Sequence, residues 1–158
     1  MQDRESYNSL VKKALANGVR ELMPWDLEEL LETDAEPLLL DIREPGEFNA
    51  MHIPGSLNVP RGVLEAACDY DFDETEPDLV KAREREIIVI CRSGNRSVLA
   101  AETLTLLGYK DVQSLKTGVR GWNDYEQPLV DGEGQSVSTE DGDEYFTTRL
   151  RPEQKTPA

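Results

Sequence analysis

Short apolar runs alternate with helical patterns along this chain, and this alternation constrains its fold more than any other feature. The runs at 37–42 (PLLLDI) and 87–90 (IIVI) are too short and too apolar for anything but buried strands. Shorter extended segments are predicted at 19–23, 57–59 and 111–115. Helices are predicted at 6–17, 24–32 and 97–107, where apolar side chains recur at helical spacing. Strands joined by helices predict an α/β fold with a parallel sheet covered on both faces.

The remaining segments are predicted to be less regular. Residues 43–48 (REPGEF) are expected to form a loop or turn, and 69–78 (DYDFDETEPD) an exposed acidic loop. Residues 79–87 begin like a helix and run into the strand at 87–90. Residues 118–129 are interpreted as a loop followed by a terminal amphipathic segment.

Three parts of the chain are expected. Residues 1–18 form an N-terminal helical extension, 19–130 a single α/β domain, and 131–158 an acidic, polar C-terminal tail. Within this tail, expected to be mobile, only 144–150 (EYFTTRL) has the apolar side chains to dock on the domain.

The charge of the chain excludes several classes of partner. Its 158 residues carry a net charge of −15, which disfavours binding to nucleic acids and to anionic membrane surfaces. No apolar run reaches the length of a membrane span, and the N-terminus does not resemble a secretory signal, so we expect a cytoplasmic protein. One histidine and two cysteines without a Cys-x-x-Cys pattern argue against a zinc site, and no cofactor is predicted. A Cys68–Cys91 disulfide is not expected.

The most reactive candidate is Cys91, which follows the strand at 87–90 directly and precedes a predicted helix. Sites in parallel sheets gather at the carboxyl ends of strands. A loop turning on Gly94 can point backbone N–H groups inward, and the helix start, with Asn95 or Ser97 as its cap, adds positive potential. Nearby arginines add charge, so the sequence favours a thiolate nucleophile over an inert buried cysteine. Cys68 (LEAACDYD) has no such surroundings and is expected to be a packing or loop residue.

Three blocks of the sequence, in order, resemble the rhodanese family of single-domain sulfurtransferases. They are LLLDIREPGEFNAMHIPGSLNVP (38–60), IIVICRSGNRSVLAAETLTLLGY (87–109) and LKTGVRGW (115–122). The resemblance implies a five-stranded parallel sheet flanked by helices on both faces. It departs from the family pattern at Met51 and Thr117, where the family often has glycine, and this concerns the shape of the loops.

The resemblance also implies a chemistry for the cysteine loop. Cys91 would attack thiosulfate or a persulfide donor, carry the sulfur as a persulfide, and pass it to cyanide, a thiol or a carrier protein in a ping-pong reaction. By the same resemblance, the donor would be bound by the loop that follows Cys91, which consists of Arg92, Ser93, Gly94, Asn95, Arg96 and Ser97. Asp41 and Arg43 would support the site, as an ion-paired scaffold or by binding the donor, and His52 would be structural. Whether Arg96 binds donor or braces the loop stays open.

Three other functions remain as alternatives. Phosphatases and arsenate reductases of the same fold use a Cys-x5-Arg loop, whereas only four residues separate Cys91 from Arg96, and the shorter loop favours sulfur. A non-catalytic binding module is disfavoured by the presence of the cysteine. A persulfide carrier in a protein sulfur relay is compatible with the acidic surface and the terminal extensions.

Overall fold

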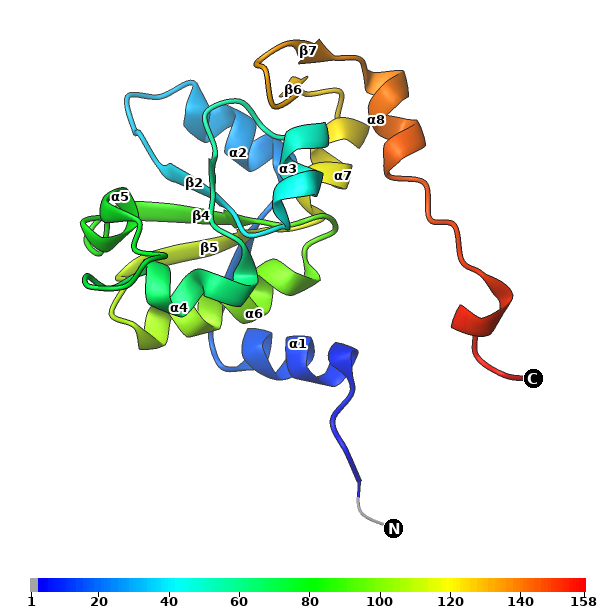
Figure 1. The fold of residues 1–158 in the computed structure, drawn as a ribbon, viewed down its shortest axis with the longest axis horizontal. Coiled ribbons are helices and arrows are strands. Elements are labelled where there is room, and N and C mark those ends of the chain that lie inside the picture. Colours follow the sequence, from blue (N-terminus) through cyan, green and yellow to red (C-terminus); the bar gives the residue numbers. More distant parts are fainter. Residues whose placement is uncertain (1–2) are drawn as a thin grey trace.

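The core of the protein is one parallel sheet of five strands, as the sequence predicts. The structure is a computed structural model that describes residues 3–158 (Figure 1). The strands lie side by side in the order β1 (Arg20–Leu22), β5 (Asp111–Leu115), β4 (Glu86–Ile90), β2 (Leu38–Asp41) and β3 (Leu57–Asn58), all parallel. The central strand, β4, is buried from Ile87 to Ile90 because helices cover both faces of the sheet.

Two layers of helices cover the sheet (Figure 1). The lower layer in this view holds α4 (Leu64–Ala67) and α6 (Asn95–Leu106), with α1 (Tyr7–Ala16) packed on α6. The upper layer holds α2 (Pro24–Leu31), α3 (Pro45–Ala50), α7 (Gly118–Asp124) and α8 (Thr139–Tyr145). The short elements are α5 (Pro77–Val80), the 3-10 turns η1 (Arg61–Val63) and η2 (Pro152–Gln154), and the paired strands β6 (Leu129–Val130) and β7 (Ser136–Val137). No helix within residues 3–158 is long and apolar enough to cross a membrane.

The apolar residues of the central strands divide between the two faces of the sheet. Leu40 and Val89 belong to the cluster shared with α4, α5 and α6, whereas Leu39 and Ile88 belong to the cluster under α2, α7 and α8. Successive strand residues point to opposite faces, so a strand covered on both sides must be apolar throughout. This is why 87–90 is a continuous apolar run.

Two segments are more regular than the sequence predicts, and one is less so. Residues 43–48 are not a loop throughout, because α3 begins at Pro45; Pro at the first helical position and a hydrogen bond from the Glu44 backbone N–H to the Glu47 carboxylate stabilise this short helix. Likewise α7 is a helix where the sequence predicts the start of a loop. In contrast, the helix expected from residue 79 is only the four-residue α5, followed by turns up to β4.

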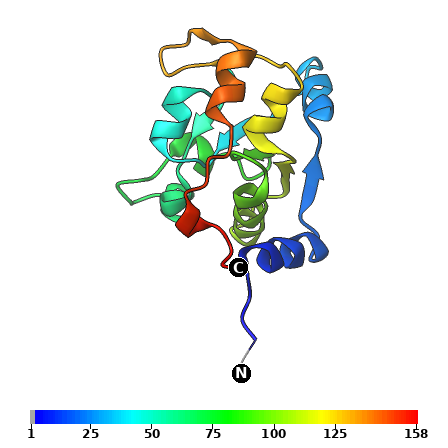
Figure 2. The same ribbon diagram turned by 90° about the vertical axis from the view of Figure 1, so that its right-hand side faces the viewer.

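After α7, residues 129–146 pack against the domain, and the chain then runs away from it. β6 and β7 form an antiparallel pair, and Val130 also bridges to His52. The following helix, α8, packs on α7 and buries Phe146 in the core cluster beneath it. Residues 147–158 are exposed and descend on the side of the molecule where α6 begins, as Figures 1 and 2 show.

Candidate active site

Cys91 lies at the carboxyl end of β4, and three groups of the following loop surround its sulfur. The backbone N–H groups of Gly94 and Ser97 donate hydrogen bonds to Sγ at 3.1 and 3.3 Å. The Cys91 thiol in turn donates to the Ser97 hydroxyl at 3.2 Å. Cys91 is 1% exposed, so these contacts replace water around the sulfur. The arrangement provides backbone dipoles for a negatively charged sulfur species.

Glycine at position 94 makes this loop possible. Gly94 has φ +99°, a backbone conformation that residues with a side chain rarely adopt. A Cβ there would also lie 2.9 Å from the backbone nitrogen of Thr117. Gly94 immediately precedes α6, so it occupies the cap position that the sequence suggested for Asn95 or Ser97.

The turn that begins α7 also holds the loop in place. The Cys91 carbonyl accepts a hydrogen bond from Val119 at 2.9 Å, and the Arg92 carbonyl accepts one from Arg120 at 3.0 Å. Gly118, with φ +61°, leaves no room for a Cβ against the Cys91 and Arg92 backbone. Thr117, which replaces a common family glycine, adopts φ +68°. Thr117 therefore holds a left-handed backbone conformation, unusual for a residue with a side chain, at the cost of local strain.

A buried hydroxyl pair continues the polar network behind the sulfur. Ser97 and Ser114 are both fully buried, and their hydroxyl oxygens are 2.7 Å apart. Since a hydroxyl can donate and accept, Ser97 can reverse its hydrogen bond and donate to Cys91 when the sulfur carries a negative charge. Ser114, on β5, is not among the predicted site residues.

The two arginines of the loop have different partners. Arg96 forms a two-bond ion pair with Glu47 on α3, at 3.1 and 2.9 Å. Arg92 donates from Nη2 to the Phe146 carbonyl at 2.8 Å, and its guanidinium lies over the Phe146 ring, 5.9 Å from the ring centre. The first contact ties the loop to the segment after β2, and the second ties it to α8.

The Glu47–Arg96 pair is partly buried, with side chains 25% and 34% exposed. Burial is the largest influence on the pKa of Glu47 and raises it, but the Arg96 hydrogen bonds, the Glu44 N–H and the nearby positive charges together lower this pKa below its ordinary value of 4.5. The same hydrogen bond, against a smaller effect of burial, raises the pKa of Arg96. Both residues are therefore charged at neutral pH.

Asp41 and Arg43 form a fully buried ion pair next to the end of β4. Arg43 donates from Nε at 3.0 Å and from Nη2 at 2.8 Å to the carboxylate, and also to the Met51 carbonyl at 2.8 Å. Asn58 holds the same turn by donating to the Asp41 and Arg43 carbonyls. Nη1 of Arg43 is the single buried side-chain polar atom in residues 3–158 that lacks a hydrogen-bond partner. The pair braces the segment between β2 and α3.

His52 lies in a structural setting. Its Nδ1 is 2.8 Å from the Phe48 carbonyl, its ring stacks on the Phe48 ring, and its backbone pairs with Val130. Trp122 is likewise structural: it is buried and donates from its indole to the Pro128 carbonyl at 2.9 Å.

The structure brings further residues to the site that the sequence did not single out. Glu47, Ser114 and Phe146 contact Arg96, Ser97 and Arg92 respectively. Tyr7, in the first turn of α1, lies within electrostatic range of the site: burial raises its pKa, and the positive charge of Arg96 opposes this. Of these four residues, only Glu47 could have been found from the sequence, because it lies in the block 43–48 (REPGEF), which resembles the family.

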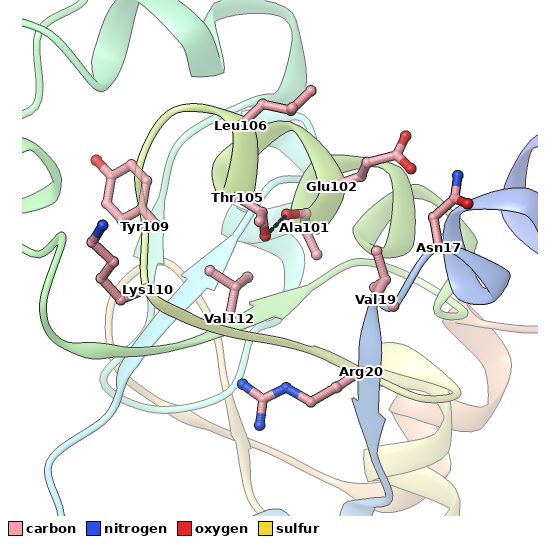
Figure 3. Close-up of a pocket in the computed structure, with 11 residues that line it drawn as sticks. Asn17, Val19, Arg20, Ala101, Glu102, Thr105, Leu106, Tyr109, Lys110 and Val112 are labelled. Carbon is pink, nitrogen blue, oxygen red and sulfur yellow. Dashed lines mark hydrogen bonds between the residues drawn. The ribbon is translucent and has the colours of Figure 1, made fainter.

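The other cysteine and one pocket of the surface lie apart from this site. Cys68 is a fully buried free thiol, and burial raises its pKa. A pocket of about 430 Å³, drawn in Figure 3, lies between α6 and the amino ends of β1 and β5. Its lining includes Arg20, Tyr109 and Lys110 but no predicted site residue. Across residues 3–158, no group of three or more His, Cys, Asp or Glu side chains is placed to hold a metal ion.

A family model and the sequences of known proteins both match this chain. The model of the Rhodanese-like domain matches residues 23–125. A mitochondrial protein of Schizosaccharomyces pombe, provisionally named as a thiosulfate sulfurtransferase, is 33% identical over 127 residues, which cover 78% of this chain and 89% of that protein. A Bacillus subtilis protein, YrkF, provisionally named as a sulfur carrier, is 31% identical over 107 residues, which cover 68% of this chain and 52% of YrkF.

Among solved structures, a protein of unknown function from Rhodopseudomonas palustris is similar in fold, with a TM-score of 0.71 and 26% identity. The similarity covers 82% of this chain and 97% of that one. It is described as a possible tyrosine phosphatase, so this neighbour raises again the phosphatase alternative that the loop length disfavours.

Proposed function

This chain belongs to the rhodanese-like domain family, and we propose that it transfers sulfane sulfur through a persulfide on Cys91. Its relatives support sulfur transfer as the general activity. The observation that carries the specific proposal is the geometry of the sulfur: two backbone N–H groups and one hydroxyl converge on Cys91 Sγ at 3.1–3.3 Å. The Cys91 thiolate that attacks the donor carries its negative charge on Sγ, and preorganised N–H donors stabilise such a charge without reorganisation.

The first half-reaction is a displacement at sulfur. The Cys91 thiolate attacks the outer sulfur of thiosulfate, a bond forms between Sγ and that sulfur, and the sulfur–sulfur bond of the donor breaks. Sulfite leaves with the electron pair, and Cys91 retains a persulfide anion. No proton is transferred in this step, so no general base is required, in keeping with the structural setting of His52.

In the second half-reaction an acceptor nucleophile attacks the outer sulfur of the persulfide. The electron pair of the broken bond returns to Cys91 as thiolate. Cyanide, a thiol or a carrier protein can serve as acceptor in this chemistry. Because donor and acceptor act in turn on one cysteine, we expect ping-pong kinetics.

The loop residues take separate roles in this proposal. Gly94 and Ser97 stabilise charge on sulfur, and Arg92 contributes positive charge for an anionic donor. Arg96 braces the loop, because both its hydrogen bonds go to Glu47. Asp41 and Arg43 act as scaffold, since their charges are paired and fully buried.

Intact-protein mass spectrometry tests the proposal. Incubation with thiosulfate, without acceptor, should add the mass of one sulfur atom to the wild-type protein and none to the Cys91→Ser variant, with a burst of sulfite stoichiometric with protein. Addition of cyanide should remove the adduct. Absence of any adduct with thiosulfate, glutathione persulfide and polysulfide would refute sulfur transfer through Cys91.

A persulfide carrier within a protein relay is the second candidate, favoured by the similarity to YrkF. A carrier would form the adduct but release it slowly to cyanide and quickly to a protein acceptor. A phosphatase, in contrast, would hydrolyse p-nitrophenyl phosphate. We expect no such hydrolysis, because the loop is one residue shorter than Cys-x5-Arg and Arg96 is occupied by Glu47.

A further inference from the structure

The contact between Arg92 and Phe146 joins the cysteine loop to a part of the chain outside the family domain. The family match ends at residue 125, whereas α8 and Phe146 lie at 139–146. Arg92 Nη2 donates to the Phe146 carbonyl at 2.8 Å, and the guanidinium lies over the Phe146 ring. Within residues 3–158, Arg92 is the one cation of the loop without a carboxylate partner, and the C-terminal extension holds it.

Phe146 is a firm anchor for this contact. Its side chain is 2% exposed and belongs to the core cluster that includes Val119 and Trp122 of α7. Its carbonyl is at the end of α8, where backbone acceptors are not used by the helix itself. A neutral acceptor fixes the guanidinium in place but leaves its positive charge uncompensated, unlike the carboxylate that neutralises Arg96.

A second set of contacts fixes α8 against α7. The Asn123 side chain is 2% exposed and donates to the Thr139 carbonyl at 3.2 Å and to the Asp143 carboxylate at 2.9 Å. Gly142 permits this approach, because a Cβ there would lie 2.6 Å from Asn123 Cγ. The position of Phe146, and through it that of Arg92, therefore depends on the close packing of these two helices.

We propose that α8 is part of the donor site: through the Phe146 carbonyl it positions Arg92, which recognises a small dianionic sulfane donor of the thiosulfate class. The inference rests on the proposed function for the identity of the ligand. A long arginine side chain loses considerable rotamer entropy when it becomes fixed. Because the contact with α8 already fixes Arg92 in the free protein, donor binding does not have to supply this free energy. Arg92 is thus a donor-binding residue, and Phe146 and Gly142 are positioning residues.

Donor binding can be measured without turnover in the Cys91→Ser background. Thiosulfate is titrated calorimetrically into this protein and into the same protein carrying Gly142→Ala, Arg92→Ala or both. We expect each change to weaken binding about fivefold or more, since a hydrogen bond involving a charged group is affected. The double change should be no weaker than Arg92→Ala alone, because α8 acts through Arg92. Glu144→Gln, at an exposed position of α8, is the matched control and should bind like the parent.

The same variants with Cys91 intact provide a second readout. With thiosulfate as donor, Gly142→Ala should raise KM and leave kcat nearly unchanged. With a monoanionic arenethiosulfonate the increase in KM should be smaller, because less of its binding depends on the charge of Arg92. A general loss of structure would instead affect both donors equally.

The possible results separate this inference from the proposed function. Unchanged thiosulfate affinity in Gly142→Ala, or additive effects of Gly142→Ala and Arg92→Ala, would overturn the role of α8. If Gly142→Ala does not fold, Asp143→Ala, which removes one hydrogen bond to Asn123, decides the matter by the same criteria. If thiosulfate binds as expected but Cys91 never acquires sulfur, the role of α8 in donor binding is supported and sulfur transfer through Cys91 is refuted.

Discussion

Ser97 contacts the sulfur of Cys91 twice, through its backbone N–H at 3.3 Å and through its hydroxyl at 3.2 Å. One residue at the start of α6 thus contributes a fixed dipole and an adjustable one. The hydroxyl is also linked to Ser114 at 2.7 Å, so both serines are held without contact to water.

Replacing Ser97 by alanine should separate these two contributions. Ser97→Ala keeps the N–H and removes the hydroxyl, so we expect the rate of persulfide formation to fall about ten- to a hundredfold, in line with the loss of one hydrogen bond to a charged group. Stopped-flow measurement of sulfite release reports this rate. Ser114→Ala is the control, because it leaves the hydroxyl of Ser97 in contact with sulfur; a larger loss in the control would contradict a direct role for Ser97.

Gly94→Ala should disrupt the loop itself. The change forces φ +99° on a residue with a side chain and places a Cβ 2.9 Å from the Thr117 nitrogen, so we expect a loss of about 1–3 kcal/mol in the free energy of unfolding and almost no persulfide. Urea denaturation and mass spectrometry measure the two effects.

Gly46→Ala is the matched control for this change. Gly46 lies in α3, where an added Cβ would meet no other atom of residues 3–158 within 4 Å, and alanine is the better helix residue. We expect equal or higher stability and unchanged sulfur loading. Equal damage from both substitutions would show that the special conformation of Gly94 does not matter.

The Glu47–Arg96 pair should stabilise the fold in a pH-dependent way. The folded-state pKa of Glu47 is lowered, so its contribution is fully present above the ordinary value of 4.5 and is lost as the pH falls through the folded-state value. For a pair about one-third exposed we expect about 0.5–1 kcal/mol. The difference in unfolding free energy between wild type and Glu47→Gln should therefore be constant from pH 7 to about 5.5 and should shrink below about pH 4.5. A difference that grows on acidification would contradict the assigned shift.

The buried Asp41–Arg43 pair should behave very differently from this partly exposed one. Asp41→Asn leaves the Arg43 charge without a counter-ion at a position that is fully buried, which costs about 3–5 kcal/mol. Thermal unfolding should show a large decrease in melting temperature for Asp41→Asn and a small one for Glu47→Gln. Similar decreases would argue against a scaffold role that depends on burial.

Cys68 should be dispensable for sulfur loading. It is buried in the core and burial raises the pKa of its thiol, so Cys68→Ala should retain a full persulfide adduct after incubation with thiosulfate. The smaller alanine side chain leaves a small cavity in the core, so we expect the free energy of unfolding to fall by about 1 kcal/mol. Mapping of the adduct to a peptide containing Cys68 would contradict this assignment.

The sequence alone determined the architecture and the position of the cysteine. A continuous apolar run at 87–90 can only be satisfied between two covering layers, and the residue that follows such a strand must emerge at the carboxyl edge of the sheet. Local chemistry also indicated that Gly94 turns the loop. The short helix α3 was missed, because a six-residue segment with proline and glycine carries too little periodicity to distinguish it from a turn.

Only the tertiary structure decided the partners of the loop residues. Arg92 and Arg96 are four residues apart and equally basic, yet the structure assigns one to a backbone carbonyl 54 residues away and the other to a carboxylate 49 residues away. Periodicity and composition describe which face a side chain lies on, whereas these pairings depend on how α3 and α8 pack over the end of β4. The sequence therefore predicted a reactive cysteine at the edge of the sheet. The packing of α3 and α8 determined that Arg96 is neutralised by a carboxylate while the charge of Arg92 is not.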